Sequence, residues 1–326
     1  MRIAVVGGGA WGVALAAHGV RAGHEVRLWV REAERARVIN ERREHPAHLP
    51  GVGLPAGLGA STDAAAVLAG AELVLVVVPS AFFREVCRNL APVWPKGAVA
   101  VSAAKGLEID TWRRMSEVAR EELPAGARAA LSGPSFALEV ARGLPTAVVV
   151  ASEDLTVAEG VQRALATRAF RVYSSDDLVG VELGGALKNV IAIAAGIVDG
   201  LGYGHNTVAA LITRGLAEIS RLVVGLGGRP DTLAGLAGLG DLVLTCTGAL
   251  SRNRHVGQAL GAGQTLADAT AGVVAEGVRT TLAACALAEA AGIEMPIARQ
   301  MRAVLYEGKP PREALDELML RSLRRE

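Results

Sequence analysis

The segment RIAVVGGGAWG, residues 2–12, predicts how the first half of this 326-residue chain folds. Residues 3–6 are consecutive apolar residues, which indicates a short buried strand. A glycine-rich turn follows, then a helical stretch over 13–21 and a second apolar strand over 25–30. Strand, glycine turn, helix and strand within about 30 residues form the βαβ unit in which this glycine spacing binds a dinucleotide.

Each glycine of the turn has a physical task. Gly7 allows the tight turn after the strand, Gly9 lets the backbone approach a pyrophosphate, and Gly12 permits close packing of the helix on the strand. The N-terminus of the following helix offers unpaired N–H groups and the positive end of its dipole to the phosphates. The spacing therefore predicts a dinucleotide site that includes these three glycines.

The end of the second strand distinguishes NAD from NADP. An acidic residue is usual there when the ligand is NAD, but this strand ends Val30-Arg31-Glu32. The guanidinium of Arg31 has the geometry to hold a 2′-phosphate; alternatively it stacks on the adenine or faces water. We predict NADP(H) as the preferred cofactor, with NAD(H) as the alternative because Glu32 is adjacent.

Further segments extend the α/β pattern. The fully apolar run 73–78 is typical of a parallel strand covered on both faces, and a helix is expected to follow it up to Leu90. Strands are also expected over 98–102 and 146–150. Between them, 131–137 contains small residues and a serine, which fits either a strand-to-helix loop that contacts a ligand or an ordinary capped turn.

From about residue 176 the strand pattern disappears and helical patterns take over. Helices are expected over the ranges 181–198, 207–226, 251–260, 276–291 and 311–324. We therefore predict an α/β Rossmann-type dinucleotide-binding domain over 1–178, followed by an all-α domain over 179–326 that binds substrate and carries the catalytic group.

Lysine is rare in this chain, which makes two of its lysines candidates for chemistry. Only four of the 34 basic residues are Lys. Lys188 lies in the apolar segment 185–192, and a buried lysine, unlike arginine, can serve as an acid or base; the alternative is a surface lysine whose stem lies along apolar neighbours. Lys105 follows the strand 98–102, at the strand end where α/β folds carry chemistry.

Two loops in the helical half carry polar groups suited to a substrate. Asp241 is the only charge in the apolar segment 238–243. Ser251, Arg252 and Asn253 precede a helix, and serine, asparagine and arginine at a helix N-terminus form a phosphate clamp. The alternative is a simple capped surface helix.

Composition argues against several other classes of protein. A net charge of +1 and only 3% aromatic residues disfavour a nucleic-acid partner. The three cysteines are far apart and the six histidines form no ligand pattern, so we expect reduced thiols and no metal site. No signal peptide is apparent, and no apolar run reaches the ~20 residues of a membrane span. A cytoplasmic location is expected.

Several segments, taken in order, resemble the bacterial NAD(P)-dependent sn-glycerol-3-phosphate dehydrogenases over essentially the whole chain. They are residues 7–12, 102–108, 132–137, 185–190, 238–242, 251–253 and 275–277. The resemblance implies that Lys188 is the catalytic acid/base. It implies substrate contacts from Lys105, Gly133, Ser135, Lys188, Asp241, Ser251, Arg252 and Asn253. It implies cofactor contacts from Gly7, Gly9, Ala10, Trp11, Gly12, Arg31, Lys105, Ala137, Arg252, Val274 and Glu276.

The resemblance also implies the reaction. The C2 carbonyl of dihydroxyacetone phosphate would be reduced with hydride from the nicotinamide, and the product would supply phospholipid synthesis. A homodimer is expected from the family. One alternative is a β-hydroxyacid or 6-phosphogluconate type dehydrogenase, against which the 251–253 clamp and the segment 102–108 argue. The other is a nucleotide-sensing module, which would leave Lys188, Lys105 and Asp241 without a role.

Overall fold

An eight-stranded sheet organises the first part of the chain in the computed structural model, which describes residues 1–322. The strands lie in the order β3-β2-β1-β4-β5-β6-β7-β8, and every neighbouring pair is parallel except β6 with β7. Their bounds are β1 (Arg2–Val6), β2 (Glu25–Trp29), β3 (Gly59–Ser61), β4 (Leu73–Val76), β5 (Val99–Ser102), β6 (Arg128–Ser132), β7 (Thr146–Ala151) and β8 (Phe170–Ser175). The order of the first six is that of the Rossmann fold, so the predicted fold class is confirmed.

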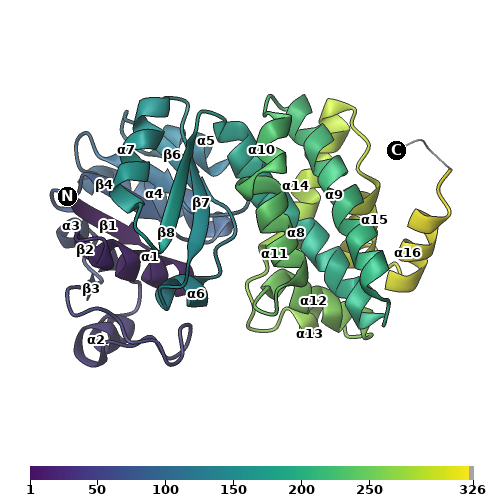
Figure 1. Cartoon of the computed structure of the whole chain (residues 1–326), viewed down its shortest axis with the longest axis horizontal. Helices are drawn as coiled ribbons and strands as arrows, with labels where there is room; N and C mark the ends of the chain where they lie inside the picture. Colours follow the sequence, from purple (N-terminus) through teal and green to yellow (C-terminus); the bar gives the residue numbers. More distant parts are fainter. Residues whose placement is uncertain (323–326) are drawn as a thin grey trace. The chain divides into compact units, whose positions relative to one another are not determined.

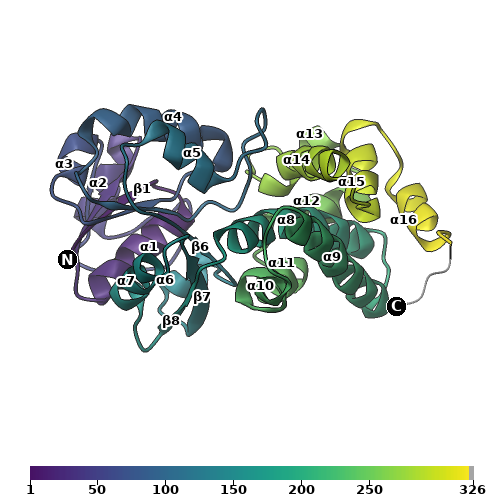
Figure 2. The same cartoon turned by 90° about the horizontal axis from the view of Figure 1, so that it is seen from above.

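Helices cover both faces of the sheet, as Figures 1 and 2 show. Because successive side chains of a strand point to opposite faces, Ile3 and Val5 of β1 join one apolar core, and Ala4 and Val6 join another. The first core is covered by α1 (Ala10–Arg21), α2 (Ala33–Arg42), α6 (Ala137–Ala141) and α7 (Leu155–Leu165). The second is covered by α3 (Ala64–Leu68), α4 (Ser80–Leu90) and α5 (Met115–Glu122), and a short 3₁₀ turn, η1 (Ala91–Val93), follows α4.

The turn between β1 and α1 requires glycine for two separate reasons. Gly7 has φ +128°, a conformation that residues with a side chain rarely adopt. A Cβ at Gly12 would overlap the carbonyl oxygen of Gly7, because the first turn of α1 packs directly on the turn. The predicted tasks of these two glycines are therefore confirmed.

The rest of the chain is helical. Its elements are α8 (Leu178–Gly200), α9 (His205–Gly225), α10 (Pro230–Ala234), the π-helical turn η2 (Leu236–Gly240), α11 (Asp241–Thr247), α12 (Arg252–Gly261), α13 (Leu266–Ala269), α14 (Glu276–Ala291), α15 (Pro296–Tyr306) and α16 (Pro311–Met319). The predicted helices are confirmed, with one correction at the C-terminus. The last was expected to run to Arg324; it ends at Met319, and residues 323–326 lie outside the described part of the chain.

Helix α8 is the core helix of this region. Among residues 1–322 it alone is long and apolar enough to pass a length-and-composition test for a membrane span, but 94% of the apolar window is buried in the protein. Helix α8 is apolar because other helices pack closely on several of its sides. A Cβ added at Gly215 of α9, Gly257 of α12 or Gly277 of α14 would overlap atoms of α8.

Contact between α8 and α12 is made by their backbones. A Cβ at Gly196 of α8 would overlap the carbonyl oxygen of Arg254, and a Cβ at Gly257 of α12 would overlap that of Ile193. Gly200 and Gly261 repeat the arrangement one turn further along. Side chains cannot fit between the two helices, so the N-terminus of α12 is held at a fixed place beside α8.

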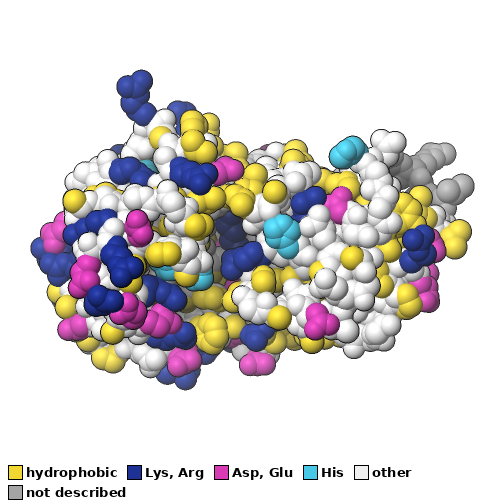
Figure 3. Space-filling view, turned by 90° about the horizontal axis from the view of Figure 1, so that it is seen from below, with side chains coloured by type: hydrophobic (Ala, Val, Ile, Leu, Met, Phe, Trp, Pro, Cys, Tyr) yellow, Lys and Arg dark blue, Asp and Glu magenta, His cyan; other side chains and the backbone are white. Residues whose placement is uncertain are grey.

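The chain forms two compact units. The first comprises residues 1–105 and 113–182, and the second comprises 106–112 and 183–326, so that α8 begins in the first unit and continues into the second. Figure 3 shows one face of the molecule, where basic and acidic side chains are interspersed over the first unit.

Candidate active site

The glycine loop of the first unit has the features that a bound dinucleotide needs. Gly9 precedes α1 as a cap residue with no side-chain hydrogen bond, and a Cβ built on it would meet nothing within 4 Å. Ala10 and Trp11 lie in the first turn of α1, which contains no acidic residue, and the first N–H groups of a helix have no partner within the helix. The indole N–H of Trp11 is also buried without a hydrogen-bond partner. The loop and helix start therefore fit the pyrophosphate of NAD(P).

Arg31 stands at the end of β2, and its side chain is 79% exposed. Its Nη2 lies 2.9 Å from Oε1 of Glu32, and Nη1 of Arg35 lies 3.1 Å from Oε2 of the same carboxylate. Burial acts to raise the pKa of Glu32, but the hydrogen bond and charge of Arg31 and the charge of Arg35 outweigh it and hold the pKa below its ordinary value. Glu32 is therefore an ionised carboxylate between two guanidinium groups.

Lys105 lies where the sequence predicted, directly after β5. Its Nζ donates to the carbonyl oxygen of Gly133 at 2.7 Å and to Oγ of Ser135 at 3.1 Å. Gly133 follows β6, the neighbour of β5 in the sheet, and its φ of +119° turns the loop towards Lys105. Ala137, the first residue of α6, completes the loop. The structure thus brings together the first unit's predicted substrate residues at the carboxyl ends of two adjacent strands.

Lys188 is buried in the helical unit, with 5% of its surface exposed, so its interpretation as a surface lysine is wrong. Its Nζ donates to Oδ1 of Asp241 at 2.5 Å and to Oγ1 of Thr245 at 2.6 Å. Asp241 is itself only 1% exposed. A buried ammonium is stable only beside a carboxylate and further polar partners, and Lys188 has both.

The position of Asp241 follows from the local helix geometry. The π-helical turn η2 closes with a hydrogen bond from the N–H of Gly240 to the carbonyl oxygen of Gly235, at 3.1 Å, and α11 begins directly afterwards. Asp241 and Thr245 are four residues apart on α11 and share one face. The Thr245 hydroxyl donates to the carbonyl oxygen of Asp241 at 2.6 Å, which orients its lone pairs for the ammonium. Wide helical turns of this kind are frequent at functional sites.

The predicted phosphate clamp lies at the start of α12, and its three members have different surroundings. The hydroxyl of Ser251 accepts the N–H of Arg254 at 3.2 Å and so caps the helix. Arg252 is exposed to solvent, whereas Asn253 is buried. Arg254 joins α12 to the end of α8, with its Nη2 2.7 Å from Oδ2 of Asp199.

Asn253 links three helices through its amide. Its Nδ2 donates to Oδ1 of Asn189 at 2.8 Å, and its Oδ1 accepts the N–H of Gly277 at 3.0 Å. Asn189 is the neighbour of Lys188 on α8, and Gly277 follows Glu276, the first residue of α14. Val274 lies before that helix and is half exposed. The amide of Asn253 therefore ties the clamp to the helix of Lys188 and to the predicted cofactor residues of α14.

Two polar residues of this cluster were absent from the predicted site. Thr245 contacts Lys188, and Asn189 contacts Asn253. Each carried a signal in the sequence: Thr245 lies one helical turn after Asp241, and Asn189 is the only polar neighbour of Lys188 in an apolar segment. The first signal depends on knowing that α11 begins at Asp241.

The three cysteines are buried, and one of them lies beside the Lys188 cluster. Cys87, Cys246 and Cys285 are free and buried, which agrees with the predicted reduced thiols. Burial raises the pKa of Cys246, beside the Lys188 cluster, to about 12, so its thiol is un-ionised at neutral pH. Within residues 1–322, no three His, Cys, Asp or Glu side chains are placed to hold a metal ion.

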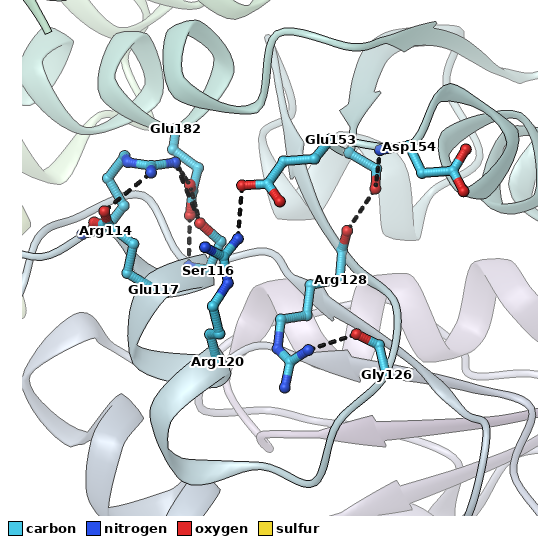
Figure 4. Close-up of polar contacts among 10 residues, drawn as sticks. Arg114, Ser116, Glu117, Arg120, Gly126, Arg128, Glu153, Asp154 and Glu182 are labelled. Atoms are coloured by element: carbon cyan, nitrogen blue, oxygen red, sulfur yellow. Dashed lines mark hydrogen bonds and ion pairs between the residues drawn. The ribbon is translucent and has the colours of Figure 1, made fainter. Parts of the chain in front are cut away.

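The N-terminal part of α8 is fixed within the first unit by Glu182 (Figure 4). Its carboxylate accepts the N–H of Ser116 at 2.8 Å and its hydroxyl at 2.5 Å, and Arg114 Nη1 donates to it at 2.9 Å. Burial raises the pKa of Glu182, although the charge of Arg114 and the bonds from Ser116 act against this. Glu182 therefore joins the start of the lysine helix to the start of α5.

Comparison with known proteins identifies the family. A family model described as the N-terminus of NAD-dependent glycerol-3-phosphate dehydrogenase matches residues 2–158, and one described as the C-terminus matches 177–316. The chain is 54% identical to the glycerol-3-phosphate dehydrogenase (NAD(P)+) of Geobacter sp. (strain M21), over 100% of this chain and 98% of the relative. The corresponding protein of Rhodospirillum rubrum is 53% identical, over 99% of this chain and 93% of its own length.

A solved structure agrees with these relatives. The crystal structure of glycerol-3-phosphate dehydrogenase from Coxiella burnetii superposes with a TM-score of 0.94 at 43% identity, covering 98% of this chain and 99% of that one. Two family models that together span most of the sequence, and relatives that match it from end to end, show that this chain belongs to the NAD-dependent glycerol-3-phosphate dehydrogenase family.

Proposed function

We propose that this chain carries out its family's reaction, the NAD(P)-linked interconversion of dihydroxyacetone phosphate and sn-glycerol 3-phosphate, with Lys188 as the acid/base. The observation that carries the assignment is the buried Lys188 ammonium, held by Asp241 and Thr245. Residues 1–178 would bind the dinucleotide, and residues 179–326 would supply the catalytic group and the clamp.

The first unit's contribution is to hold the cofactor. The glycine loop, with Gly7, Gly9 and Gly12, and the first turn of α1, with Ala10 and Trp11, would cradle the pyrophosphate. Arg31 lies at the adenosine end and favours NADP(H) over NAD(H). Ala137, Val274 and Glu276 would complete the nucleotide contacts. When bound, the nicotinamide supplies the hydride for the reduction and accepts it in the reverse direction.

Lys188 would transfer the proton in both directions of the reaction. Reduction at C2 of the substrate would leave negative charge on the C2 oxygen, and the Lys188 ammonium would donate the proton that converts it to a hydroxyl. In the oxidation the neutral amine takes that proton back. Asp241 and Thr245 fix Nζ by the two hydrogen bonds at 2.5 and 2.6 Å, so the ammonium is oriented before the reaction.

Different residues would bind the phosphate of the substrate and the polar groups near its reacting carbon. Ser251, Arg252 and Asn253 stand at the N-terminus of α12, where backbone N–H groups and a guanidinium suit a phosphate. The exposed side chain of Arg252 is the member most accessible to substrate and cofactor. Lys105, with Gly133 and Ser135, would contact the substrate near the reacting carbon. Lys105 would also contact the cofactor.

Three wider properties are part of the same proposal. We propose a homodimer, which is the commonest arrangement of soluble oligomeric enzymes. We propose a cytoplasmic location, supported by three free, buried thiols. The glycerol 3-phosphate formed would supply phospholipid synthesis.

The test compares the substitution of Lys188 by alanine with the same substitution at a control lysine. Lys188→Ala should reduce turnover of dihydroxyacetone phosphate by orders of magnitude, followed as loss of nicotinamide absorbance, while the dissociation constant for NADPH stays close to that of the parent protein. Lys96→Ala removes an exposed lysine in a turn and should leave both quantities unchanged. Near-normal turnover of Lys188→Ala would exclude the acid/base role.

A further inference from the structure

Three charged side chains at the end of β2 form one cluster, and the proposed function gives a role to only one of them, Arg31. Arg31 donates to Oε1 of Glu32 through Nε at 3.1 Å and Nη2 at 2.9 Å. Arg35, one turn further along on α2, brings its Nη1 to 3.1 Å from Oε2 of the same carboxylate. We call Arg31, Glu32 and Arg35 the β2-end cluster. Two guanidinium groups therefore share one carboxylate at the strand end that reads the adenosine ribose.

Arg35 also touches the glycine loop. Its Nη1 donates to the carbonyl oxygen of Gly8 at 3.2 Å, and Nε2 of His45 lies 2.9 Å from the same oxygen. A Cβ at Gly8 would lie 3.2 Å from Cδ of Arg35, so this side chain packs directly against the loop. The side chain of Arg35 is 30% exposed, compared with 79% for Arg31. Arg35 is therefore the inner cation of the cluster, and it lies between the strand end and the loop that fits the pyrophosphate.

The chemistry of the cluster sets up a competition. Guanidinium groups bind carboxylates and phosphates through the same planar N–H donors. A 2′-phosphate carries more negative charge and more acceptor oxygens than one carboxylate. Glu32 therefore occupies the Arg31 donors that a 2′-phosphate would use, and it forms an ion pair with Arg35 without a hydrogen bond to its Oε2. A ribose without that phosphate has a 2′-hydroxyl instead, and a carboxylate at this place accepts its hydrogen bond.

We propose that Arg35 is a second specificity-determining residue for NADPH, and that Glu32 competes with the 2′-phosphate for Arg31 and Arg35. NADPH would bind by displacing the carboxylate from the two arginines, whereas NADH would bind with the carboxylate in place. The His45 contact to Gly8 would keep the loop braced when Arg35 turns to the phosphate. This inference rests on the proposed use of NAD(P)H and assigns roles to residues of the same site.

The experiment measures binding, so that it does not depend on turnover. Dissociation constants of NADPH and NADH are determined by calorimetry for the full chain, with adenosine 2′,5′-bisphosphate and adenosine 5′-monophosphate as probes of the 2′-phosphate alone. Arg35→Leu should weaken NADPH and the bisphosphate by about 10- to 100-fold, the loss expected for charged hydrogen bonds. NADH and the monophosphate should change by less than about threefold. Arg35→Lys, which keeps the charge, should recover part of the loss.

Glu32→Gln is the reciprocal variant and should have opposite effects on the two cofactors. NADPH should bind more tightly, because its competitor is gone, and NADH should bind more weakly, because an ionised acceptor is lost. Arg37→Leu is the matched control: Arg37 lies on the same helix but pairs with Glu34 and Glu41, and its removal should change neither constant. Arg31→Ala should resemble Arg35→Leu.

Two results would overturn the inference. Equal weakening of NADH and NADPH in Arg35→Leu would reduce Arg35 to a support of the glycine loop, and unchanged NADPH binding in Glu32→Gln would exclude competition by Glu32. Failure of the proposed function has a different signature: the parent protein would bind neither nicotinamide cofactor.

Discussion

Lys188 Nζ lies 2.5 Å from Asp241 Oδ1 in a place where neither side chain is more than 6% exposed. Such a pair is strongly coupled: removal of one partner leaves an uncompensated buried charge, whereas removal of both leaves none. The pair therefore affects the stability of the helical unit as well as its chemistry. Substitution of both residues separates the cost of an unpaired buried charge from the cost of lost packing.

Asp241→Leu should lower the free energy of unfolding by about 3–5 kcal/mol, because the Lys188 ammonium would be buried without its carboxylate. Lys188→Met combined with Asp241→Leu should recover most of that loss, since both charges are gone and the apolar volumes are similar. Urea denaturation followed by circular dichroism measures both. A double variant as unstable as the single one would show that the loss comes from packing.

Thr245→Val should lower turnover and leave NADPH binding unchanged. Valine keeps the shape of the side chain but removes the hydroxyl, which accepts from Lys188 at 2.6 Å and donates to the Asp241 carbonyl oxygen at 2.6 Å. Thr245→Ser restores the hydroxyl and should restore most of the turnover. If the serine variant were as slow as the valine variant, the methyl group would be the important part of Thr245.

Substitutions of the three clamp residues should differ in their effects on protein stability and on substrate binding. Arg252→Ala removes an exposed side chain, so it should raise the Michaelis constant for dihydroxyacetone phosphate without a change in melting temperature. Ser251→Ala removes a helix cap and should cost about 1 kcal/mol of stability. Asn253→Ala should affect both, because its amide contacts Asn189 and Gly277. A stability loss in Arg252→Ala would contradict its assignment as a ligand-binding side chain.

Gly196→Ala should destabilise the protein by about 1–3 kcal/mol, the usual cost of an overpacked contact. The new methyl group would overlap the carbonyl oxygen of Arg254 on α12. Gly160→Ala is the matched control, because Gly160 lies inside α7 with nothing within 4 Å of the added Cβ. It should stabilise the protein by about 0.5–1 kcal/mol through helix propensity. Thermal unfolding of the two variants compares them directly.

Glu218 should make stability depend on pH. Its carboxylate accepts the N–H of Ile297 at 2.9 Å at the start of α15, with Arg221 and Arg321 nearby, but burial raises its pKa to about 7. A carboxyl whose folded pKa lies above its ordinary value of 4.5 contributes stability that is complete below pH 4.5 and is lost as the pH rises through 7. The size of the effect is on the order of 1–3 kcal/mol.

The control for this pH effect is Glu218→Gln, which keeps an acceptor oxygen but has no proton to lose. Between pH 5 and pH 8 the parent protein should lose more unfolding free energy than the glutamine variant. Comparison within the pair cancels contributions from other groups, including Glu182, whose pKa burial also raises. Parallel pH profiles of the two proteins would show that Glu218 does not titrate in this range.

Strands with continuous apolar runs could be predicted from the sequence, and weaker ones could not. The run 73–78 gave β4 because a parallel strand is buried on both faces. β6 is alanine-rich and β3 has only three residues, so neither has a strand composition. The sequence of β8 does alternate, with Phe170 and Val172 buried and Arg171 and Tyr173 exposed, so β8 carries a strand signal that the predicted strands do not include. Antiparallel pairing of β6 with β7 depends on long-range register.

The chemistry of the site was more predictable than its contacts. The resemblance implied a shared substrate role for Lys105 and Gly133, but their proximity depends on the pairing of β5 with β6, a strand that the sequence did not predict. That Lys188 is buried against Asp241 follows only from the folded helices, since the residues are 53 positions apart. The residue type alone could not assign a role to Ser251, because a serine before a helix suits a helix cap and a phosphate ligand equally. In the structure its hydroxyl caps α12.

The backbone contact between α8 and α12 has a consequence for how the enzyme loses activity. No side chain fits between the helices at Gly196 and Gly257, so we expect water to reach the amides at this contact only when the helices separate. Separation would also break the Asn253–Asn189 hydrogen bond, which joins the clamp to the lysine helix. The slowest hydrogen exchange of the helical unit should therefore fall on this contact, and inactivation by denaturant should be a cooperative, all-or-none event.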